Sequence, residues 1–428
     1  MAEPTQPTLD TLESKTGSAT ETFVVGGAPG REHHVEDPSI RPFTFHASDE
    51  ELAELKRRIL ATRWPERETV DDDTQGVQLA TIQKLADYWA TSHNWRQVEA
   101  RLNSYPNFIT NIFGLDIHFI HVKSKHDGAL PLIVTHGWPG SVVEQLKIVE
   151  PLTDPTSFGG SAEDAFDLVI PSMPGYGFSE KPAATGWGPE QIGRAWDVLM
   201  KRLGYDRYVA QGGDWGAIIV DQMGVQAPDG LLGIHTNMAC VIPAELDGAA
   251  FTGAPAPEGL GEEERHSFDH VSFFYKHGLG YAWEMGNRAQ TLYGLADSPI
   301  ALAAWIIDHD IWTYRQIAKL FDGAEQGFTR DEILDNITLY WLTNTGVSSG
   351  RLYWENKLPF FSPKGVEIPV AVSAFPEEIC PATRKWAEAA YPNLLFFRKH
   401  AEGAHFAAWE QPKALVEDLR EGFRTLRS

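Results

Sequence analysis

The stretch Gln211-Gly212-Gly213-Asp214-Trp215-Gly216 decides the fold of this chain. Its glycine spacing is typical of a nucleophile elbow, a sharp strand-to-helix turn that needs small residues two before and two after the nucleophile. Gly212 and Gly216 supply them, and an aspartate stands where such elbows usually carry serine. We therefore expect a strand over residues 208–211 that leads into this turn, and a helix directly after it.

Aspartate at this position changes the chemistry that the elbow predicts. A serine hydroxyl needs an adjacent base before it can attack, whereas an Asp with a reference pKa of about 3.9 is ionised by roughly 1000:1 at neutral pH. It can attack an alkyl carbon directly and form an ester with the enzyme. A base is then needed only in the second step, to direct water at that ester. Asp214 therefore predicts hydrolysis of a strained or activated alkyl centre, such as an epoxide or an alkyl halide.

Short apolar runs surround the elbow along the chain. The expected strands are 107–112, 117–122, 131–135, 166–170 and 231–236, and a helix is expected over 189–203. Runs such as the third and fourth suit strands that are buried on both faces of a sheet. Ligands of such sheets bind beyond the carboxyl ends of the strands, where the elbow also falls.

A long segment interrupts this alternation. Residues 239–363 read as helical and aromatic-rich, and the α/β pattern returns with strand 368–374, helix 382–391, strand 394–398 and helix 413–426. Strand-helix alternation with one helical insertion implies a mostly parallel sheet with helices on both faces and a helical cap. The predicted organisation is an α/β-hydrolase core in two parts, residues 105–238 and 364–428, with a cap (lid) over residues 239–363.

The N-terminal part is divided into a tail and a helical segment. Residues 1–39 are rich in Thr, Ser, Glu, Pro and Gly and carry too little apolar surface to offset the entropy of ordering, so we expect a flexible tail. Residues 40–104 are expected to form an N-terminal helical segment that wraps the core. In it, Ser48 and Glu51 predict a capping box, and apolar spacing predicts a second helix over 77–91.

An ester intermediate needs a base and a group that orients the base. His405 lies after the last strand of the second core part, and Glu378 follows strand 368–374. The chain order of nucleophile, acid and histidine is that of the α/β-hydrolases. Glu377 is the neighbouring competitor for the acid, and spacing alone leaves the two open.

The hydrolysis of an ester also needs donors for an oxyanion. The backbone N–H after the nucleophile, on Trp215, is one candidate. The loop after strand 131–135 supplies the other, for which Trp138 in His136-Gly137-Trp138-Pro139-Gly140 is the candidate. Removing one such donor typically costs about 2.7–4 kcal/mol of transition-state stabilisation.

These motifs together resemble the microsomal-type epoxide hydrolase family. The resemblance rests on His136 to Ser141, Gly212 to Gly216, and Gly403-Ala404-His405-Phe406-Ala407-Ala408, and it extends to the early stretch from Pro42-Phe43-Thr44-Phe45 to Arg63-Trp64-Pro65. It covers nearly everything from about residue 41 to the end. The resemblance implies an enzyme that converts an epoxide to a vicinal diol through an ester on Asp214, and it maps the acid of the triad best onto Glu378.

The resemblance also implies two cap tyrosines that protonate the epoxide oxygen. By motif they fall on Tyr281, in Gly280-Tyr281-Ala282-Trp283-Glu284, and on Tyr353, in Arg351-Leu352-Tyr353-Trp354-Glu355-Asn356. A phenol with a reference pKa of about 10 stays protonated beside an ionised aspartate at neutral pH. Tyr340 and Tyr275 are the main rivals for this role.

Composition limits the partners. A formal net charge of −23 over 428 residues repels nucleic acid and anionic membranes. No basic region followed by an apolar run marks the N-terminus as a signal peptide, so the expected location is the cytoplasm. The two cysteines, Cys240 and Cys380, are expected to be buried thiols. The expected partners are a small hydrophobic epoxide and water, with no cofactor, no metal ion and no membrane anchor, and a homodimer is a candidate assembly.

Two alternatives belong to other classes of function. A haloalkane dehalogenase would share the Asp elbow and the Trp after it, but it needs donors for a departing halide, often an Asn in the loop that here reads His-Gly-Trp-Pro-Gly. A non-catalytic binding protein on a hydrolase fold should lack part of the triad, and here every element of the triad is present.

Overall fold

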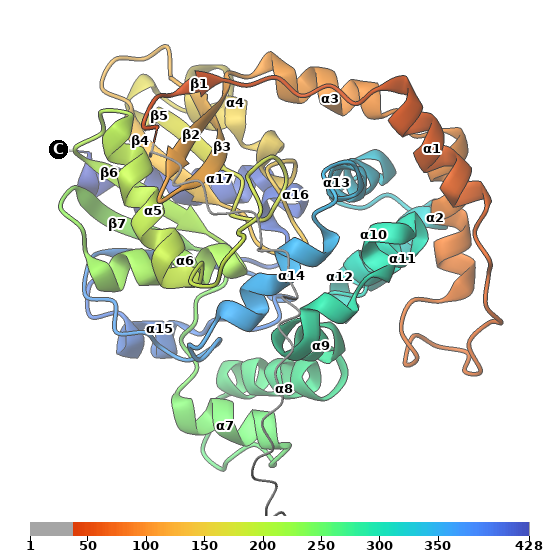
Figure 1. Cartoon of the computed structure of the whole chain (residues 1–428). Helices are drawn as coiled ribbons and strands as arrows, with labels where there is room; N and C mark the ends of the chain where they lie inside the picture. The colour runs from red at the N-terminus through yellow and green to blue at the C-terminus, as the bar shows by residue number, and fades with distance from the viewer. Residues whose placement is uncertain (1–36, 428) are drawn as a thin grey trace, which may run out of the picture. The chain divides into compact units, whose positions relative to one another are not determined.

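The computed structural model describes residues 37–427, so most of the predicted tail, residues 1–36, lies outside the described part. A mixed sheet forms the centre, with the strand order β1-β2-β3-β5-β4-β6-β7-β8-β9 (Figure 1). The strands are β1 Arg41–Pro42, β2 Asn107–Ile112, β3 Leu115–Val122, β4 Leu130–Thr135, β5 Phe166–Pro171, β6 Tyr208–Gly212, β7 Leu231–Thr236, β8 Val370–Ala374 and β9 Leu394–Lys399.

The sheet is mostly parallel, as the sequence predicts. All neighbouring pairs from β5 through β4, β6, β7 and β8 to β9 are parallel, and β1, β2, β3 and β5 pair antiparallel. In the centre, Thr135 at the end of β4 pairs with Gly212 at the end of β6. This register brings the loop after β4 beside the elbow after β6.

Helices cover both faces of the sheet. In Figure 1, α5 (Pro189–Arg202) and α6 (Trp215–Gln226) lie on one face, and α4 (Val149–Thr153) and α17 (Pro412–Gly422) lie on the other. The remaining helices of the core are α15 (Arg384–Ala390) and α16 (Ala407–Glu410), with the short 3-10 helices η1 Glu144–Lys147, η2 Pro155–Ser157, η3 Ala162–Asp164 and η5 Arg424–Leu426. The helix predicted over 413–426 is therefore shorter and is followed by a 3-10 turn.

A helical cap is inserted between β7 and β8, within the residues predicted for it. Its elements are α7 Ala244–Thr252, α8 Glu262–His277, α9 Gly280–Arg288, η4 Ala289–Thr291, α10 Gly294–Asp297, α11 Pro299–Ile307, α12 Ile311–Phe321, α13 Arg330–Leu342 and α14 Gly346–Glu355. The cap and core are joined by buried hydrogen bonds. Ser141 Oγ donates to Asn336 Oδ1 at 2.7 Å, and Asn336 Nδ2 donates to the Pro139 carbonyl at 2.7 Å.

The N-terminal helices pack against the cap. They are α1 Asp49–Leu60, α2 Leu79–Thr91 and α3 Trp95–Ser104, the last of which no specific sequence signal predicted. Trp89 Nε1 donates to Thr338 Oγ1 at 2.9 Å, and the Gln78 N–H donates to the Tyr314 hydroxyl at 2.8 Å. The N-terminal segment therefore holds the cap in position through these hydrogen bonds. The capping box of Ser48 and Glu51 at the start of α1 is confirmed.

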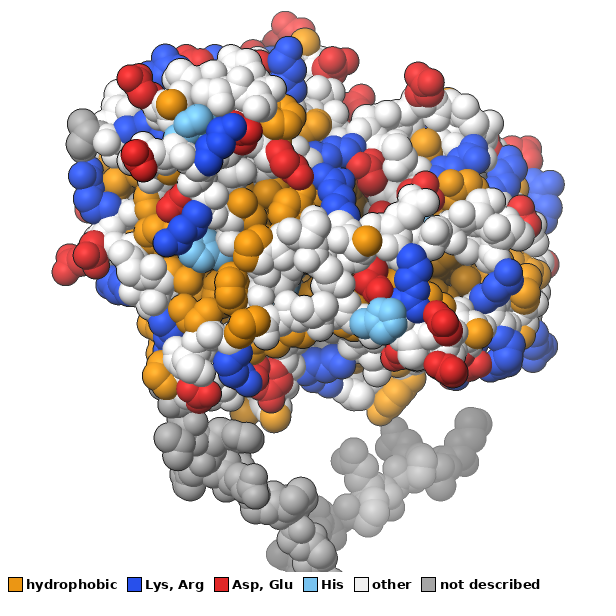
Figure 2. Space-filling view, turned by 90° about the horizontal axis from the view of Figure 1, so that it is seen from above, with side chains coloured by type: hydrophobic (Ala, Val, Ile, Leu, Met, Phe, Trp, Pro, Cys, Tyr) orange, Lys and Arg blue, Asp and Glu red, His pale blue; other side chains and the backbone are white. Residues whose placement is uncertain are grey.

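Two further expectations concern the surface and the thiols. Cys240 and Cys380 are both free and buried, as predicted. On the face drawn in Figure 2, acidic and basic side chains are interspersed, so the negative net charge does not collect in one patch there. Among the described residues, no helix is both long enough and apolar enough to cross a membrane.

Candidate active site

The elbow after β6 has the backbone geometry that its glycines predict. Asp214 has a φ of 52° and a ψ of −126°, a conformation that non-glycine residues rarely adopt. A Cβ on Gly212 would collide with the carbonyl of Gly216, and a Cβ on Gly216 would collide with the carbonyl of Thr135. Close backbone contacts therefore hold the turn and place the Asp214 side chain at the carboxyl end of the sheet.

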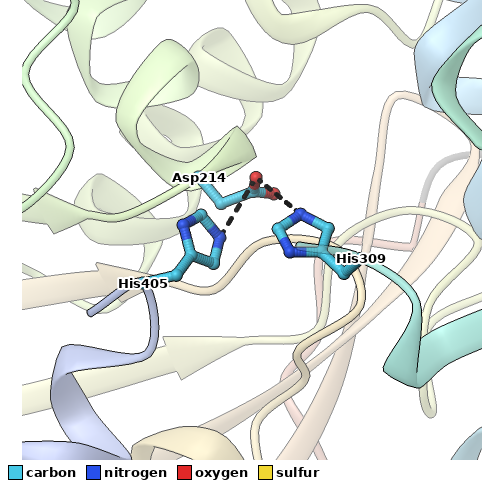
Figure 3. A group of neighbouring side chains, drawn as sticks. All are labelled: Asp214, His309 and His405. Atoms are coloured by element: carbon cyan, nitrogen blue, oxygen red, sulfur yellow. Dashed lines mark ion pairs between the residues drawn. The ribbon is translucent and has the colours of Figure 1, made fainter. Parts of the chain in front are cut away.

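The two oxygens of Asp214 differ in their surroundings. Oδ1 accepts a hydrogen bond of 2.7 Å from the backbone N–H of Trp138, in the loop after β4. Oδ2 faces two imidazoles, with His405 Nε2 at 3.4 Å and His309 Nε2 at 3.8 Å (Figure 3). Oδ1 is thus held by the Trp138 N–H, and Oδ2 is the oxygen that faces the imidazoles.

The electrostatics of Asp214 favour its ionised form. Burial of the carboxyl pushes its pKa upward, and the side chain is only 8% exposed. The hydrogen-bonding and charge interactions with His405, the charge of His309 and the backbone N–H of Trp215 outweigh burial, so the pKa of Asp214 is lowered. A carboxylate that is buried but ionised is a suitable nucleophile.

His405 and Glu378 form a buried pair beside the elbow. His405 Nδ1 lies 2.6 Å from Glu378 Oε1, and each side chain is 1% exposed. Burial disfavours the charged imidazole, but the carboxylates of Glu378 and Asp214 raise the pKa of His405 well above its ordinary value. Glu377 is exposed, so the structure brings Glu378 and not Glu377 to the histidine.

The loop that carries His405 is held by a carboxylate that the sequence did not reveal. Glu410, in α16, accepts the backbone N–H of Ala404 at 3.0 Å and that of Phe406 at 2.9 Å. These two residues flank His405 in the chain. Burial raises the pKa of Glu410 to about 7. A glutamate five residues after a histidine carries no specific signal, because only the folded loop aims both N–H groups at it.

The two predicted tyrosines come from the cap and meet above the elbow. Tyr281 (α9) stacks on the Trp138 ring, with centroids 4.8 Å apart, and Tyr353 (α14) contacts the Trp215 ring edge-on at 4.7 Å. The two phenol rings are 5.8 Å apart. Burial, followed by neighbouring negative groups that include Asp214, raises the pKa of both phenols well above the ordinary value, so both remain protonated.

The rival tyrosines are engaged elsewhere. The Tyr340 hydroxyl donates to the Gly140 carbonyl at 2.8 Å, and the Tyr275 hydroxyl donates to Asp247 at 2.6 Å. Neither hydroxyl is therefore free to donate to a ligand above Asp214.

A cavity of about 670 Å³ opens onto the elbow between core and cap. Asp214, Trp215, Tyr281 and Tyr353 all line it, and its other walls are mainly aromatic and apolar, including Phe251, Phe274, Leu279, Trp283, Leu358, Phe360, Phe361 and Ile379. A second cavity, of about 610 Å³, is lined by α14 and by the segment from Pro182 to Thr185. It does not include any of the predicted site residues.

His309 and its neighbour Asp310 were also missed by the sequence analysis. They lie in the short loop between α11 and α12, where the only signal is a histidine flanked by two acids in an apolar cap. A carboxylate oxygen of Asp214 and one imidazole nitrogen each of His309 and His405 lie within 4.8 Å of one another. Such a group of atoms could also bind a metal ion. A metal ion there would occupy the carboxylate that the predicted chemistry uses as nucleophile, so we interpret the group as a site for attack and proton transfer.

This chain is similar to known proteins over most of its length. A family model described as "Epoxide hydrolase N terminus" matches residues 40–145, and one described as "alpha/beta hydrolase fold" matches residues 131–262. Epoxide hydrolase 1 of Sus scrofa is 36% identical over 422 residues, covering 94% of this chain and 93% of the relative. A Stigmatella aurantiaca protein whose name designates an epoxide hydrolase is 48% identical over 391 residues, covering 91% of this chain and 86% of the relative.

Two solved epoxide hydrolase structures are also similar to this chain over most of its length. The Aspergillus niger epoxide hydrolase superposes with a TM-score of 0.77 at 32% identity, covering 91% of this chain and 97% of the other. The juvenile hormone epoxide hydrolase of the silkworm Bombyx mori superposes with a TM-score of 0.79 at 30% identity, covering 92% and 96%.

Proposed function

Because this chain belongs to the microsomal-type epoxide hydrolase family and is an epoxide hydrolase, we propose that Asp214 opens the epoxide ring and carries the resulting ester. This membership leaves the haloalkane dehalogenase and binding-protein alternatives without support. The single observation that carries the proposed mechanism is the asymmetry of the Asp214 carboxylate, whose Oδ1 accepts the Trp138 N–H while Oδ2 faces the imidazoles.

In the first half-reaction, Oδ2 attacks an epoxide carbon. The Trp138 N–H keeps Oδ1 in place, so Oδ2 is the oxygen that forms the new C–O bond. Tyr281 and Tyr353 line the same cavity as the carboxylate, and both donate hydrogen bonds to the epoxide oxygen, which takes one proton from the pair as the ring opens. General acid catalysis of this kind typically contributes about 10²–10⁴-fold.

In the second half-reaction, His405 removes a proton from water, and the water attacks Cγ of Asp214. The negative charge develops on Oδ1, where the backbone N–H of Trp138 stabilises it, and the Trp215 N–H is a second donor to the same carboxylate. Glu378 accepts a hydrogen bond from the Nδ1–H of His405 and stabilises the imidazolium. The Cγ–Oδ2 bond then breaks, and the diol leaves with Oδ2.

The cavity supports an uncharged, hydrophobic epoxide as the substrate. Its charged lining residues are Asp214 and Asp247, and Asp247 accepts hydrogen bonds from Tyr275 at 2.6 Å and from Ser362 at 2.9 Å. The other walls are mainly aromatic and aliphatic, which suits an apolar ligand. The cytoplasmic location and the homodimer expected from the sequence stay predictions.

The origin of the oxygen in the diol tests this mechanism. In a single turnover in ¹⁸O-labelled water, unlabelled enzyme should give unlabelled diol, and the label should then be found in Asp214. A fully labelled diol in the first turnover would contradict a covalent ester. As a second test, His405→Gln should accumulate an adduct of enzyme plus epoxide mass, seen by intact-protein mass spectrometry, while Asp214→Asn should form none.

A further inference from the structure

His309 presents an imidazole nitrogen to the nucleophile that the mechanism above does not use. The side chain is 2% exposed, and Nδ1 lies 3.1 Å from Asp310 Oδ2. Asp310 is itself fixed, because its Oδ1 accepts the Thr313 N–H at 2.8 Å at the start of α12. The opposite nitrogen, Nε2, is buried without a hydrogen-bond partner in the described residues and faces Asp214 Oδ2 at 3.8 Å.

Two histidine–carboxylate pairs therefore surround one oxygen of Asp214: His309 with Asp310, and His405 with Glu378. Each imidazole is oriented by a buried carboxylate at Nδ1, and each aims Nε2 at Asp214 Oδ2 (Figure 3). Their rings are 4.6 Å apart. One pair comes from the core and the other from the cap, so a substrate attached to Oδ2 would have an imidazole from each.

The second half-reaction requires an acid at this oxygen. Oδ2 leaves with the alkyl group, and an alkoxide is a poor leaving group unless it is protonated as the C–O bond breaks. His405 holds the proton that it has just taken from the attacking water. His309 is the second histidine whose Nε2 faces the departing atom.

We propose that His309 is a catalytic residue that protonates Oδ2 as the ester is cleaved, with Asp310 as its positioning residue. This inference rests on the proposed function, in which Oδ2 is the oxygen that carries the alkyl group. It assigns the two imidazoles separate roles: His405 is the base toward water, and His309 is the acid toward the diol.

Every proton that is transferred in this step has a donor and an acceptor. Water loses one proton to His405, and its oxygen forms a bond to Cγ, which places the negative charge on Oδ1. The Cγ–Oδ2 bond breaks as the C=O bond re-forms, and the electron pair on Oδ2 takes the proton of the His309 imidazolium. The carboxylic acid that remains on Asp214 returns its proton to His309, and the proton on His405 replaces the one that the tyrosines gave to the epoxide oxygen.

Single-turnover kinetics of His309→Gln and His309→Phe test the role. Rapid quenching with intact-mass detection follows both the formation and the decay of the alkyl-enzyme. We expect formation within about threefold of wild type and decay slower by about 100-fold, within the range of general acid catalysis, so that the adduct accumulates. Asp310→Asn should slow the same step by a smaller factor. Asp308→Asn, an exposed carboxylate in the same loop, is the matched control and should change neither step.

Epoxides whose product hydroxyls differ in acidity distinguish a general-acid role of His309 from a purely structural one. An epoxide with an electron-withdrawing group beside the attacked carbon yields a better leaving alkoxide, so the decay defect of the His309 variants should shrink by about tenfold or more. A decay rate within threefold of wild type, or a defect that is the same for both epoxides, would overturn the proposal. If wild type and His405→Gln form no adduct at all, the proposed function fails; if they do and the His309 variants hydrolyse it normally, only this inference fails.

Discussion

Glu378 Oε1 lies 2.6 Å from His405 Nδ1, and the two side chains are almost completely buried. The preceding residue, Glu377, contacts the histidine loop through its backbone. The Glu377 N–H donates to the Gly403 carbonyl at 3.1 Å, and Glu377 forms a bridge to Ala404. Glu377 is exposed, whereas the Glu378 side chain is buried against His405.

This pairing predicts a large difference between two adjacent substitutions. Glu378→Gln should slow hydrolysis of the alkyl-enzyme by about 100-fold or more, because the imidazolium loses its buried counter-charge. Glu377→Gln should keep wild-type kcat, because its side chain is exposed. Steady-state kinetics on both variants checks the assignment, and a larger loss in the Glu377 variant would reverse it.

The tyrosine pair predicts a defect in the opposite half-reaction. Tyr281→Phe and Tyr353→Phe should each slow formation of the alkyl-enzyme by about 10²-fold, because ring opening loses a proton donor. Tyr275→Phe is the control: it lines the same cavity, but its hydroxyl is committed to Asp247. Rapid-quench measurement of adduct formation separates the outcomes, and normal formation in both Tyr281 and Tyr353 variants would exclude the pair as acids.

Glu410 predicts a defect that arises from positioning. Its carboxylate accepts the N–H groups on both sides of His405, so Glu410→Ala should lower the free energy of unfolding by about 1.5–3 kcal/mol and slow ester hydrolysis. Adduct formation, which does not use His405, should change less. Glu417→Gln, an exposed glutamate of α17, is the control. Denaturant unfolding with single-turnover kinetics measures both effects, and an equal loss in both half-reactions would argue against the positioning role.

Glu144 predicts a pH dependence of stability. Burial raises its pKa from an ordinary value of 4.5 to about 8. Between these values the folded state binds more protons than the unfolded state, so this group's contribution to stability is present below pH 4.5 and is lost as the pH rises through 8. Glu144→Gln should therefore flatten the fall in Tm between pH 5 and 8, without abolishing it, because Glu410 acts with the same sign. As a control, substitution of the exposed Glu163 (Glu163→Gln) should leave the slope of Tm against pH unchanged. An unaltered slope in Glu144→Gln would contradict the inference that Glu144 is buried as a neutral acid.

Local signals in the sequence were sufficient for the fold and for part of the site. Apolar runs gave the central strands, and β2 and β7 match their predicted bounds. The glycines around Asp214 predicted a sharp strand-to-helix turn, and Asp214 has a positive φ of 52° at this turn. The sequence carries these signals because a tight turn, or a strand buried on both faces, restricts the residue types at fixed, short spacings.

The sequence by itself determined that Asp214 sits at an elbow, that a histidine follows the last strand, and that a cap interrupts the sheet. The tertiary structure decided between Glu377 and Glu378, brought Glu410 to the histidine loop, and placed His309 opposite His405. These three depend on which way a side chain points and on what is packed across from it. Such directions are set by contacts between segments far apart in the chain, for which spacing along the sequence carries no signal.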